Sequence, residues 1–151
     1  MYDASTQAHL ESVEPAGVRF ILPGTVAKVK RETISACVIT FNEECNIGPC
    51  LASVKWCDEI IVVDSESSDR TVEIARRFTD KIFTQPWSGY GPQKAAAFAR
   101  ATCDWIMEID ADERCSPMLR ASIERVLSTD TPHNGFWVKR RNIYLGRWMR
   151  N

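Results

Sequence analysis

Residues 105–113 read Trp-Ile-Met-Glu-Ile-Asp-Ala-Asp-Glu, a short apolar run that ends in two aspartates two positions apart and a glutamate. Residues i and i+2 of an extended segment point to the same side, so a strand here would bring Asp110 and Asp112 together at its carboxyl end. The carboxyl ends of parallel strands form the ligand-binding edge of an open α/β sheet. Hard carboxylate oxygens at that edge suit Mg²⁺ or Mn²⁺, especially when a substrate phosphate supplies further ligands. The alternative interpretation is a solvated acidic turn after a buried strand.

Strands and helices alternate along the rest of the chain. Apolar, β-branched runs predict strands, and apolar positions at helical spacing behind a capping residue predict helices. The expected strands are 34–40, 60–63, 81–84 and 104–109, and the expected helices are 46–54, 69–78, 93–101 and 116–127, with Asn46, Asp69 and Ser116 as caps. Short connections between such elements are typical of βαβ units, so we predict an α/β domain with a mostly parallel sheet and helices on both faces. Residues 135–144 are expected to be extended.

The domain is expected to occupy residues 33–151. Residues 1–32 show no convincing periodicity, and we expect them to form a flexible lead-in. A chain of 151 residues with 44% hydrophobic and 26% charged content suits one globular domain. No apolar run approaches the roughly 20 residues needed to cross a bilayer, and the N-terminus lacks the pattern of a signal peptide. These features predict a soluble protein.

Charge and cysteine content narrow the function classes. A net charge of −1 argues against general nucleic-acid binding. None of the six cysteines forms a C-x-x-C pair, and His9 and His133 lie far from any cysteine cluster in the sequence, so a structural zinc site is not expected. We interpret the cysteines as reduced, mostly buried thiols of a cytoplasmic protein.

Three polar clusters follow predicted strands, at residues 40–44, 64–69 and 110–113. Because the carboxyl ends of parallel strands share one edge of the sheet, these clusters would line one pocket. Such a pocket would offer the ring of Phe41, hydrogen-bonding carboxylates and a divalent cation. A nucleoside diphosphate needs a face on which to stack, acceptors for its base and ribose, and a cation for its phosphates. Ordinary solvated loops are the alternative for each cluster.

The sequence resembles the family 2 inverting glycosyltransferases, which have the GT-A fold. The resemblance spans residues 35–142 and rests on four motifs: residues 39–44 (Ile-Thr-Phe-Asn-Glu-Glu), residues 62–71, residues 89–94 (Gly-Tyr-Gly-Pro-Gln-Lys) and residues 110–113. Residues 142–148 resemble the branch that modifies the lipopolysaccharide inner core, the β-1,4-glucosyltransferase type acting on heptose. The resemblance implies a Rossmann-like, nucleotide-sugar-binding domain with UDP-glucose as donor and a glycan or lipid-linked sugar as acceptor. Family members usually continue well past this length, so it also implies a C-terminally incomplete domain that retains the donor half.

The resemblance assigns the nucleoside to the first two clusters. Phe41 takes the place of the aromatic residue that stacks on uracil, and Asn42 and Glu43 line the nucleoside site. Asp64 matches the aspartate that hydrogen-bonds uracil or ribose. From the residues alone, Phe41 could instead belong to the core, and Asp64 could cap a helix.

The diphosphate is assigned to the other two motifs. Lys94 lies where a basic residue approaches the diphosphate, and Asp110 and Asp112 match the DxD motif, whose second aspartate is usually the direct Mg²⁺ or Mn²⁺ ligand. A solvated charge on a helix is the alternative for Lys94. The family's general base is normally a carboxylate C-terminal to the DxD motif, and we do not assign that role to Glu113; the catalytic base is expected beyond the C-terminus.

Three other functions compete with a hexosyltransferase. A nucleotidyltransferase shares the architecture, but its first loop is usually rich in glycine and basic residues, whereas residues 41–44 here are acidic and glycine-free. A non-catalytic module would bind the nucleotide sugar without turnover. A phospho-receiver domain also has aspartates at strand ends, but it leaves Phe41, Gln93 and Lys94 unexplained.

Aromatic and basic residues alternate between Trp137 and Arg150. One interpretation is contact with a phosphorylated, lipid-linked acceptor at the inner face of the cytoplasmic membrane. The other is an edge strand protected by charge.

Overall fold

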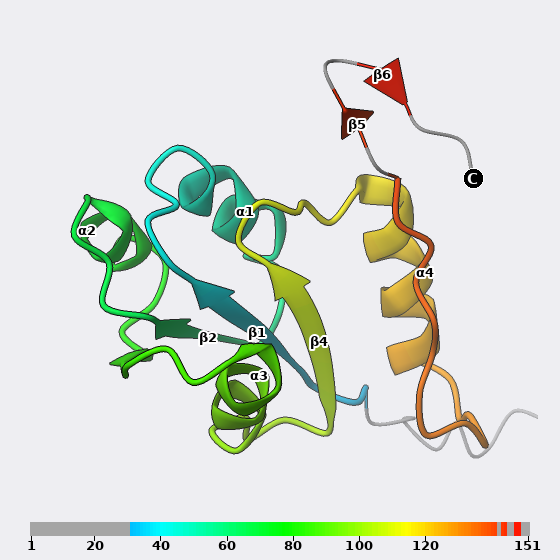
Figure 1. Ribbon diagram of the computed structural model, residues 1–151. Helices are drawn as coiled ribbons and strands as arrows, with labels where there is room; N and C mark the ends of the chain where they lie inside the picture. The colour runs from blue at the N-terminus through cyan, green and yellow to red at the C-terminus, as the bar shows by residue number, and fades with distance from the viewer. Residues whose placement is uncertain (1–30, 142, 145–146, 149–151) are drawn as a thin grey trace, which may run out of the picture.

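The computed structural model describes residues 31–141 and the backbone of residues 143–144 and 147–148 (Figure 1). Its centre is a four-stranded parallel sheet in the order β3-β2-β1-β4. The strands are β1 (Ile34–Thr40), β2 (Glu59–Asp64), β3 (Ile82–Thr84) and β4 (Trp105–Asp110). All seven residues of β1 are buried, as expected for a central strand with helices on both faces. The predicted α/β class with a parallel sheet is confirmed.

Helices cover both faces of this sheet (Figure 1). One face carries α1 (Ile47–Ser53), α2 (Thr71–Ala75) and α4 (Pro117–Leu127), and the other carries α3 (Tyr90–Phe98). Side chains of β1 alternate between two apolar cores: Val38 packs with Leu51 and Leu127, and Cys37 packs with Ala97. Burial of each large aliphatic side chain contributes about 1.5–3 kcal/mol, so the two cores fix the helices against the sheet.

The strand register places the candidate residues along one edge. Thr40 lies beside Asp64 of β2, and Ile39 lies beside Asp110 of β4. The three strands therefore end level with one another, and the loops that follow them start from the same edge of the sheet. β1 lies between β2 and β4, so Asp64 and Asp110 are two strand spacings apart, about 10 Å.

Local capping differs from the prediction at two helices. Ser116 caps α4 as predicted, because its hydroxyl accepts the N–H of Leu119 at 3.2 Å. Asn46 makes no side-chain cap; its amide donates to Glu43 Oε2 at 2.8 Å instead. Asp69 accepts the N–H of Thr71 at 2.9 Å, but it lies one residue before the N-cap position of α2.

The remaining predictions have mixed outcomes. Helix α3 begins three residues before the predicted start, directly after Gly89, whose φ of 105° few other residues adopt. Residues 135–141 carry no regular secondary structure; of the predicted extended segment, residues 143–144 form β5 (Ile143–Tyr144), which pairs antiparallel with β6 (Arg147–Trp148). Most of the predicted lead-in, residues 1–30, lies outside the described residues, as do the side chains from residue 142 onward.

Two further expectations concern membrane-spanning helices and the state of the cysteines. Within residues 31–141, no helix combines the length and apolar character needed to cross a bilayer. All six cysteines are unpaired, as expected for reduced thiols. Three of them are buried (Cys37, Cys50 and Cys115), so the expectation of mostly buried thiols holds for half of the set.

Candidate functional site

The loop after β1 is bound to the loop after β2 through Asn42. Its side-chain oxygen accepts the N–H of Ser68 at 2.8 Å, and its own N–H donates to Ser67 Oγ at 2.8 Å. Asn42 adopts a φ of 50°, a left-handed conformation that asparagine tolerates better than most residues. These bonds hold the first two predicted clusters together at the edge of the sheet.

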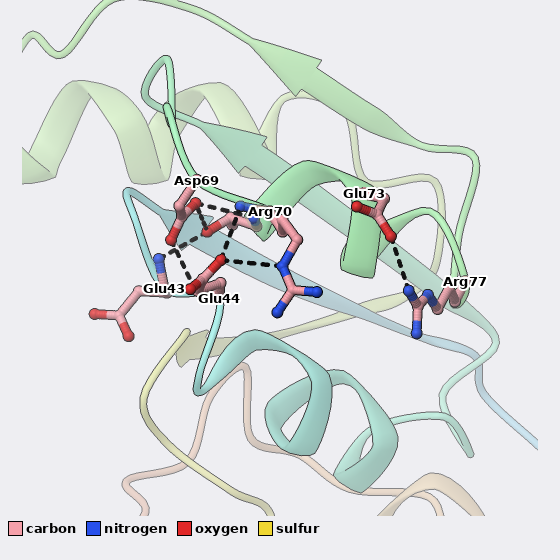
Figure 2. A network of polar contacts seen from close by, with 7 residues as sticks. Glu43, Glu44, Asp69, Arg70, Glu73 and Arg77 are labelled. Atoms are coloured by element: carbon pink, nitrogen blue, oxygen red, sulfur yellow. Dashed lines mark hydrogen bonds and ion pairs between the residues drawn. The ribbon is translucent and has the colours of Figure 1, made fainter.

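A second set of bonds joins the same two loops beside α1 and α2 (Figure 2). Glu44 N–H donates to Asp69 Oδ2 at 3.0 Å, and Glu44 Oε2 accepts Arg70 N–H at 3.1 Å. Glu43 N–H donates at 2.8 Å to the hydroxyl of Thr71, a fully buried residue. Desolvation, the largest single effect, would raise the pKa of Asp69, but hydrogen bonds from Thr71 and Glu44 outweigh it and leave that pKa below its ordinary value. Asp69 therefore holds the two loops together as an ionised carboxylate.

Asp64 lies beneath these loops and is 1% exposed. One carboxylate oxygen accepts Ser67 N–H at 2.9 Å, and the other accepts the Ser67 hydroxyl at 2.5 Å. The side chain thus shapes the turn after β2. Each carboxylate oxygen keeps a second lone pair for another donor.

Phe41 points away from the core and is 56% exposed. The alternative that it is a core residue is therefore wrong. An exposed ring at the end of the central strand, next to the polar atoms of Asn42, gives this edge an apolar face on which a planar group can stack.

A second group of site residues gathers around the end of β4. Lys94 of α3 forms an ion pair with Glu108 and lies 3.3 Å from Asp110 Oδ1. Its side chain is 22% exposed, so it is not simply a solvated charge. The hydrogen bond that Lys94 donates to Glu108 is the main cause that raises the pKa of Lys94, which keeps the ammonium charged. On the other side of the same carboxylate, Arg140 Nη2 lies 3.7 Å from Asp110 Oδ2.

The two aspartates of the DxD motif have different surroundings. β4 ends at Asp110, and Glu113 N–H closes a turn onto the Asp110 carbonyl at 2.9 Å. Asp112 therefore lies in a turn, and the predicted same-side pairing of the two aspartates within one strand does not apply. Asp110 is partly buried, whereas Asp112 is exposed.

The carboxylate oxygens of this turn are suitable ligands for a hard divalent cation. They do not form a complete protein cage: among residues 31–141, no group of three or more histidines, cysteines, aspartates or glutamates is placed to hold a metal ion. Water and the phosphate oxygens of a ligand would have to complete the coordination shell, which is how Mg²⁺ sites with one or two carboxylates usually work.

Two residues of the site were not assigned to the donor site from the sequence. Gln93 is fully buried, donates to Ser65 Oγ at 2.6 Å and accepts from Gln85, so it connects α3 to the ends of β2 and β3. Its position beside Lys94 in the motif of residues 89–94 was an available signal. Arg140 gave no local signal, because its partners are about 30 positions away in the chain.

The predicted site residues therefore fall into two groups. Phe41, Asn42, Glu43 and Asp64 gather where β1 and β2 end, and Lys94 and Asp110 gather where β4 ends, followed by Asp112 in the turn. Among the described residues, no hydrogen bond or ion pair joins the two groups directly. A ligand that touches both must extend across the end of β1.

Comparison with known proteins places this arrangement among glycosyltransferases. The family described as "Glycosyl transferase family 2" matches residues 35–150. An uncharacterized glycosyltransferase of Rickettsia felis is 46% identical over 99 residues, covering 65% of this chain and 35% of that protein. The lipopolysaccharide core biosynthesis glycosyltransferase LpsC of Rhizobium meliloti is 35% identical over 118 residues, covering 75% of this chain and 44% of that protein. The chain therefore spans only 35% and 44% of the length of these two relatives.

A solved structure supports the same fold. The mannosyltransferase PcManGT of Pyrobaculum calidifontis, in complex with GDP-Man and Mn²⁺, matches with a TM-score of 0.56 at 24% identity, over 70% of this chain and 34% of that one. At this level of identity the likeness shows the fold, which is the GT-A fold predicted from the sequence.

Proposed function

Because the chain belongs to glycosyl transferase family 2, we propose that it forms the donor-binding half of a hexosyltransferase. The donor is a nucleoside diphosphate sugar, UDP-glucose by preference. The acceptor is a glycan such as the lipopolysaccharide inner core, and transfer inverts the anomeric centre with assistance from a divalent cation.

The observation that carries this proposal is the shared edge formed by the ends of β1, β2 and β4. An exposed aromatic ring and backbone-anchored polar loops lie on one side, and a lysine with two carboxylates lies on the other. The separation of about 10 Å suits a ligand whose base lies at one end and whose phosphates lie at the other. A nucleoside diphosphate has this shape and this distribution of charge.

In the proposed complex, the nucleoside occupies the β1–β2 side. Phe41 stacks on uracil, Asn42 and Glu43 line the site, and Asp64 accepts a hydrogen bond from uracil or ribose. The dense bonding of these loops supports this arrangement, because Asp64 and Asn42 are already held by Ser67 and Ser68 before a ligand arrives. Preorganised polar groups lower the entropic cost of binding.

The diphosphate occupies the β4 side. A divalent cation held by Asp112, with Asp110 beside it, would act as a Lewis acid on the leaving diphosphate. Lys94 remains charged and would stabilise the same negative charge electrostatically. The general base is not assigned. Glu113 is a poor candidate, because its carboxylate already accepts Asp110 N–H at 3.1 Å and pairs with Arg140 at 3.1 Å.

We place the acceptor near residues 136–141 and the reaction at the inner face of the cytoplasmic membrane. Phe136, Trp137 and Val138 are exposed, and Lys139, Arg140 and Arg141 follow directly. Such a surface suits a phosphorylated, lipid-linked sugar. The relationship to LpsC supports a lipopolysaccharide acceptor.

Calorimetric titration with UDP, UDP-glucose and GDP, with and without Mn²⁺, tests the donor site. We expect Mn²⁺-dependent binding of UDP and UDP-glucose that is lost in Asp112→Asn and unchanged in Asp80→Asn, an exposed aspartate outside the site. A folded chain that binds none of these nucleotides would refute the donor site. Sugar transfer by this chain to purified lipopolysaccharide core would refute the non-catalytic binding module.

A further inference from the structure

The segment after α4 contacts both ends of β4 through its side chains. At the start of β4, the ring of Phe136 lies 5.7 Å from that of Trp105. At the end of β4, Arg140 reaches Asp110 and Glu113. Residues 136–140 therefore follow the strand in the same direction, from the amino end of β4 to the acidic turn; in Figure 1 they form the orange segment beside α4.

Arg140 anchors the carboxyl-terminal end of this segment through ion pairs. Its Nε lies 3.1 Å from Glu113 Oε1, and its Nη2 lies 3.7 Å from Asp110 Oδ2. Lys94 lies 3.3 Å from the other oxygen of Asp110. Both oxygens of this carboxylate thus face a cation of the protein, one from α3 and one from the segment after α4.

A divalent cation at this turn would meet a carboxylate, Asp110, that two cations of the protein already contact. Arg140 carries one positive charge beside the oxygens that the cation would approach, and like charges at that distance repel. Each cation has a second partner, Glu108 for Lys94 and Glu113 for Arg140, but Lys94 is 22% exposed whereas Arg140 is 57% exposed and has solvent to move into. Of the two cations, Arg140 is the one that can leave at low cost.

We propose that Arg140 is the internal counter-ion of the aspartate turn and that a divalent cation displaces it, which releases the Arg140 end of this segment from the end of β4. Arg140 is then a positioning residue that couples donor binding to the segment we assign to the acceptor. The coupling is reciprocal: whatever stabilises the Arg140 contacts weakens cation binding, and bound cation weakens those contacts. This inference rests on the proposed metal-assisted donor site.

The test uses the full chain and three variants. Arg140→Gln removes the counter-ion, Arg140→Lys keeps the charge, and Arg77→Gln removes a comparable surface ion pair, Arg77–Glu73 at 2.9 Å on the other side of the molecule (Figure 2). The first measurement is the Mn²⁺ concentration that gives half-maximal UDP binding. We expect Arg140→Gln to need about twofold to fivefold less Mn²⁺, the range set by the strength of exposed ion pairs, and the other two to behave like the wild type.

The second measurement is trypsin cleavage within residues 139–141, which does not depend on activity. Mn²⁺ with UDP should accelerate cleavage of the wild type, and Arg140→Gln should be cleaved quickly without them, at Lys139 and Arg141.

The outcomes separate this inference from the donor site. If the wild type binds no UDP at any Mn²⁺ concentration, the donor site fails and the inference fails with it. If UDP binds but Arg140→Gln needs the same amount of Mn²⁺ or more, the donor site stands and the counter-ion role is refuted. A higher requirement would instead make Arg140 a ligand of the diphosphate.

Discussion

A single buried carboxylate accepts hydrogen bonds at the amino ends of the strands, and its removal should measurably lower the stability of the protein. Glu59, at the start of β2, is 7% exposed. It accepts the N–H and the hydroxyl of Thr102, both at 2.9 Å, as well as the Ser35 hydroxyl and the Lys81 ammonium. These partners come from β1 and from the connections that lead into β3 and β4, so one charge links four strands.

The size of the effect follows from the pKa of Glu59. Desolvation, the largest single effect, would raise this pKa, but the hydrogen bonds from Lys81, Ser35 and Thr102 outweigh it and lower the pKa from 4.5 to about 2. Each pKa unit corresponds to about 1.4 kcal/mol, which gives roughly 3 kcal/mol of stability at neutral pH. Because the pKa is lower in the folded state, this stability is complete above the unfolded value and is lost as the pH falls from about 4.5 toward 2.

Urea unfolding of the wild type and Glu59→Gln at several pH values tests this reasoning. The variant should be less stable by about 2–3 kcal/mol at pH 7, and the gap should shrink to about 1 kcal/mol near pH 3, where the wild-type carboxylate loses its advantage. Glu73→Gln is the matched control: its ion pair with Arg77 is exposed, so its loss should cost less than about 0.5 kcal/mol. A gap at pH 7 no larger than that of the control, or a gap that does not change with pH, would refute the assigned role of Glu59.

Three further predictions concern the carboxyl edge of the sheet. Asn42→Ala should lose about 1–2 kcal/mol of stability and weaken UDP binding, because alanine disfavours a φ of 50° and cannot accept the N–H of Ser68; equal stability in urea would contradict this. Exposed Cys45 should react with a disulfide reagent at pH 8 long before Cys50, since burial raises the pKa of Cys50 to about 12; peptide mapping of the labelled chain gives the order, and early labelling of Cys50 would show that the core opens. Phe41→Ala should change stability by less than about 0.5 kcal/mol yet weaken UDP binding by about 1 kcal/mol or more; unfolding and calorimetry separate the two, and the reverse pattern would make Phe41 a packing residue.

The strands and their order of appearance were predictable because burial leaves a direct mark on the sequence. β1 matches the predicted range 34–40 residue for residue, since a strand covered on both faces reads as one unbroken apolar run. Ser116 was predictable for a similar reason: its hydroxyl, its partner Leu119 and the proline between them lie within one helical turn.

Asn46 shows where local patterns mislead. Its N–H and that of Ile47 both donate to the Glu43 carbonyl, at 2.9 and 2.8 Å, so the chain already turns helically before the expected cap. Asn46 has φ −110° and ψ −34°, whereas a capping residue usually adopts extended backbone angles. The contacts that build the nucleoside side, such as Asn42 with Ser68 and Glu43 with Thr71, join residues more than 20 positions apart and leave no periodic signal.

The turn at the predicted DxD motif shows where the geometric argument from the sequence was wrong. Alternation along a strand would place Asp110 and Asp112 side by side as equivalent ligands, but the strand ends at Asp110 and the backbone turns at once. The turn gives the two carboxylates different environments: Asp110 lies between Lys94 and Arg140, and Asp112 is exposed. A cation from solvent meets the exposed Asp112 first, and it must compete with Lys94 and Arg140 for Asp110. The different roles proposed for the two aspartates therefore follow from where β4 ends, which the spacing of two residues alone does not reveal.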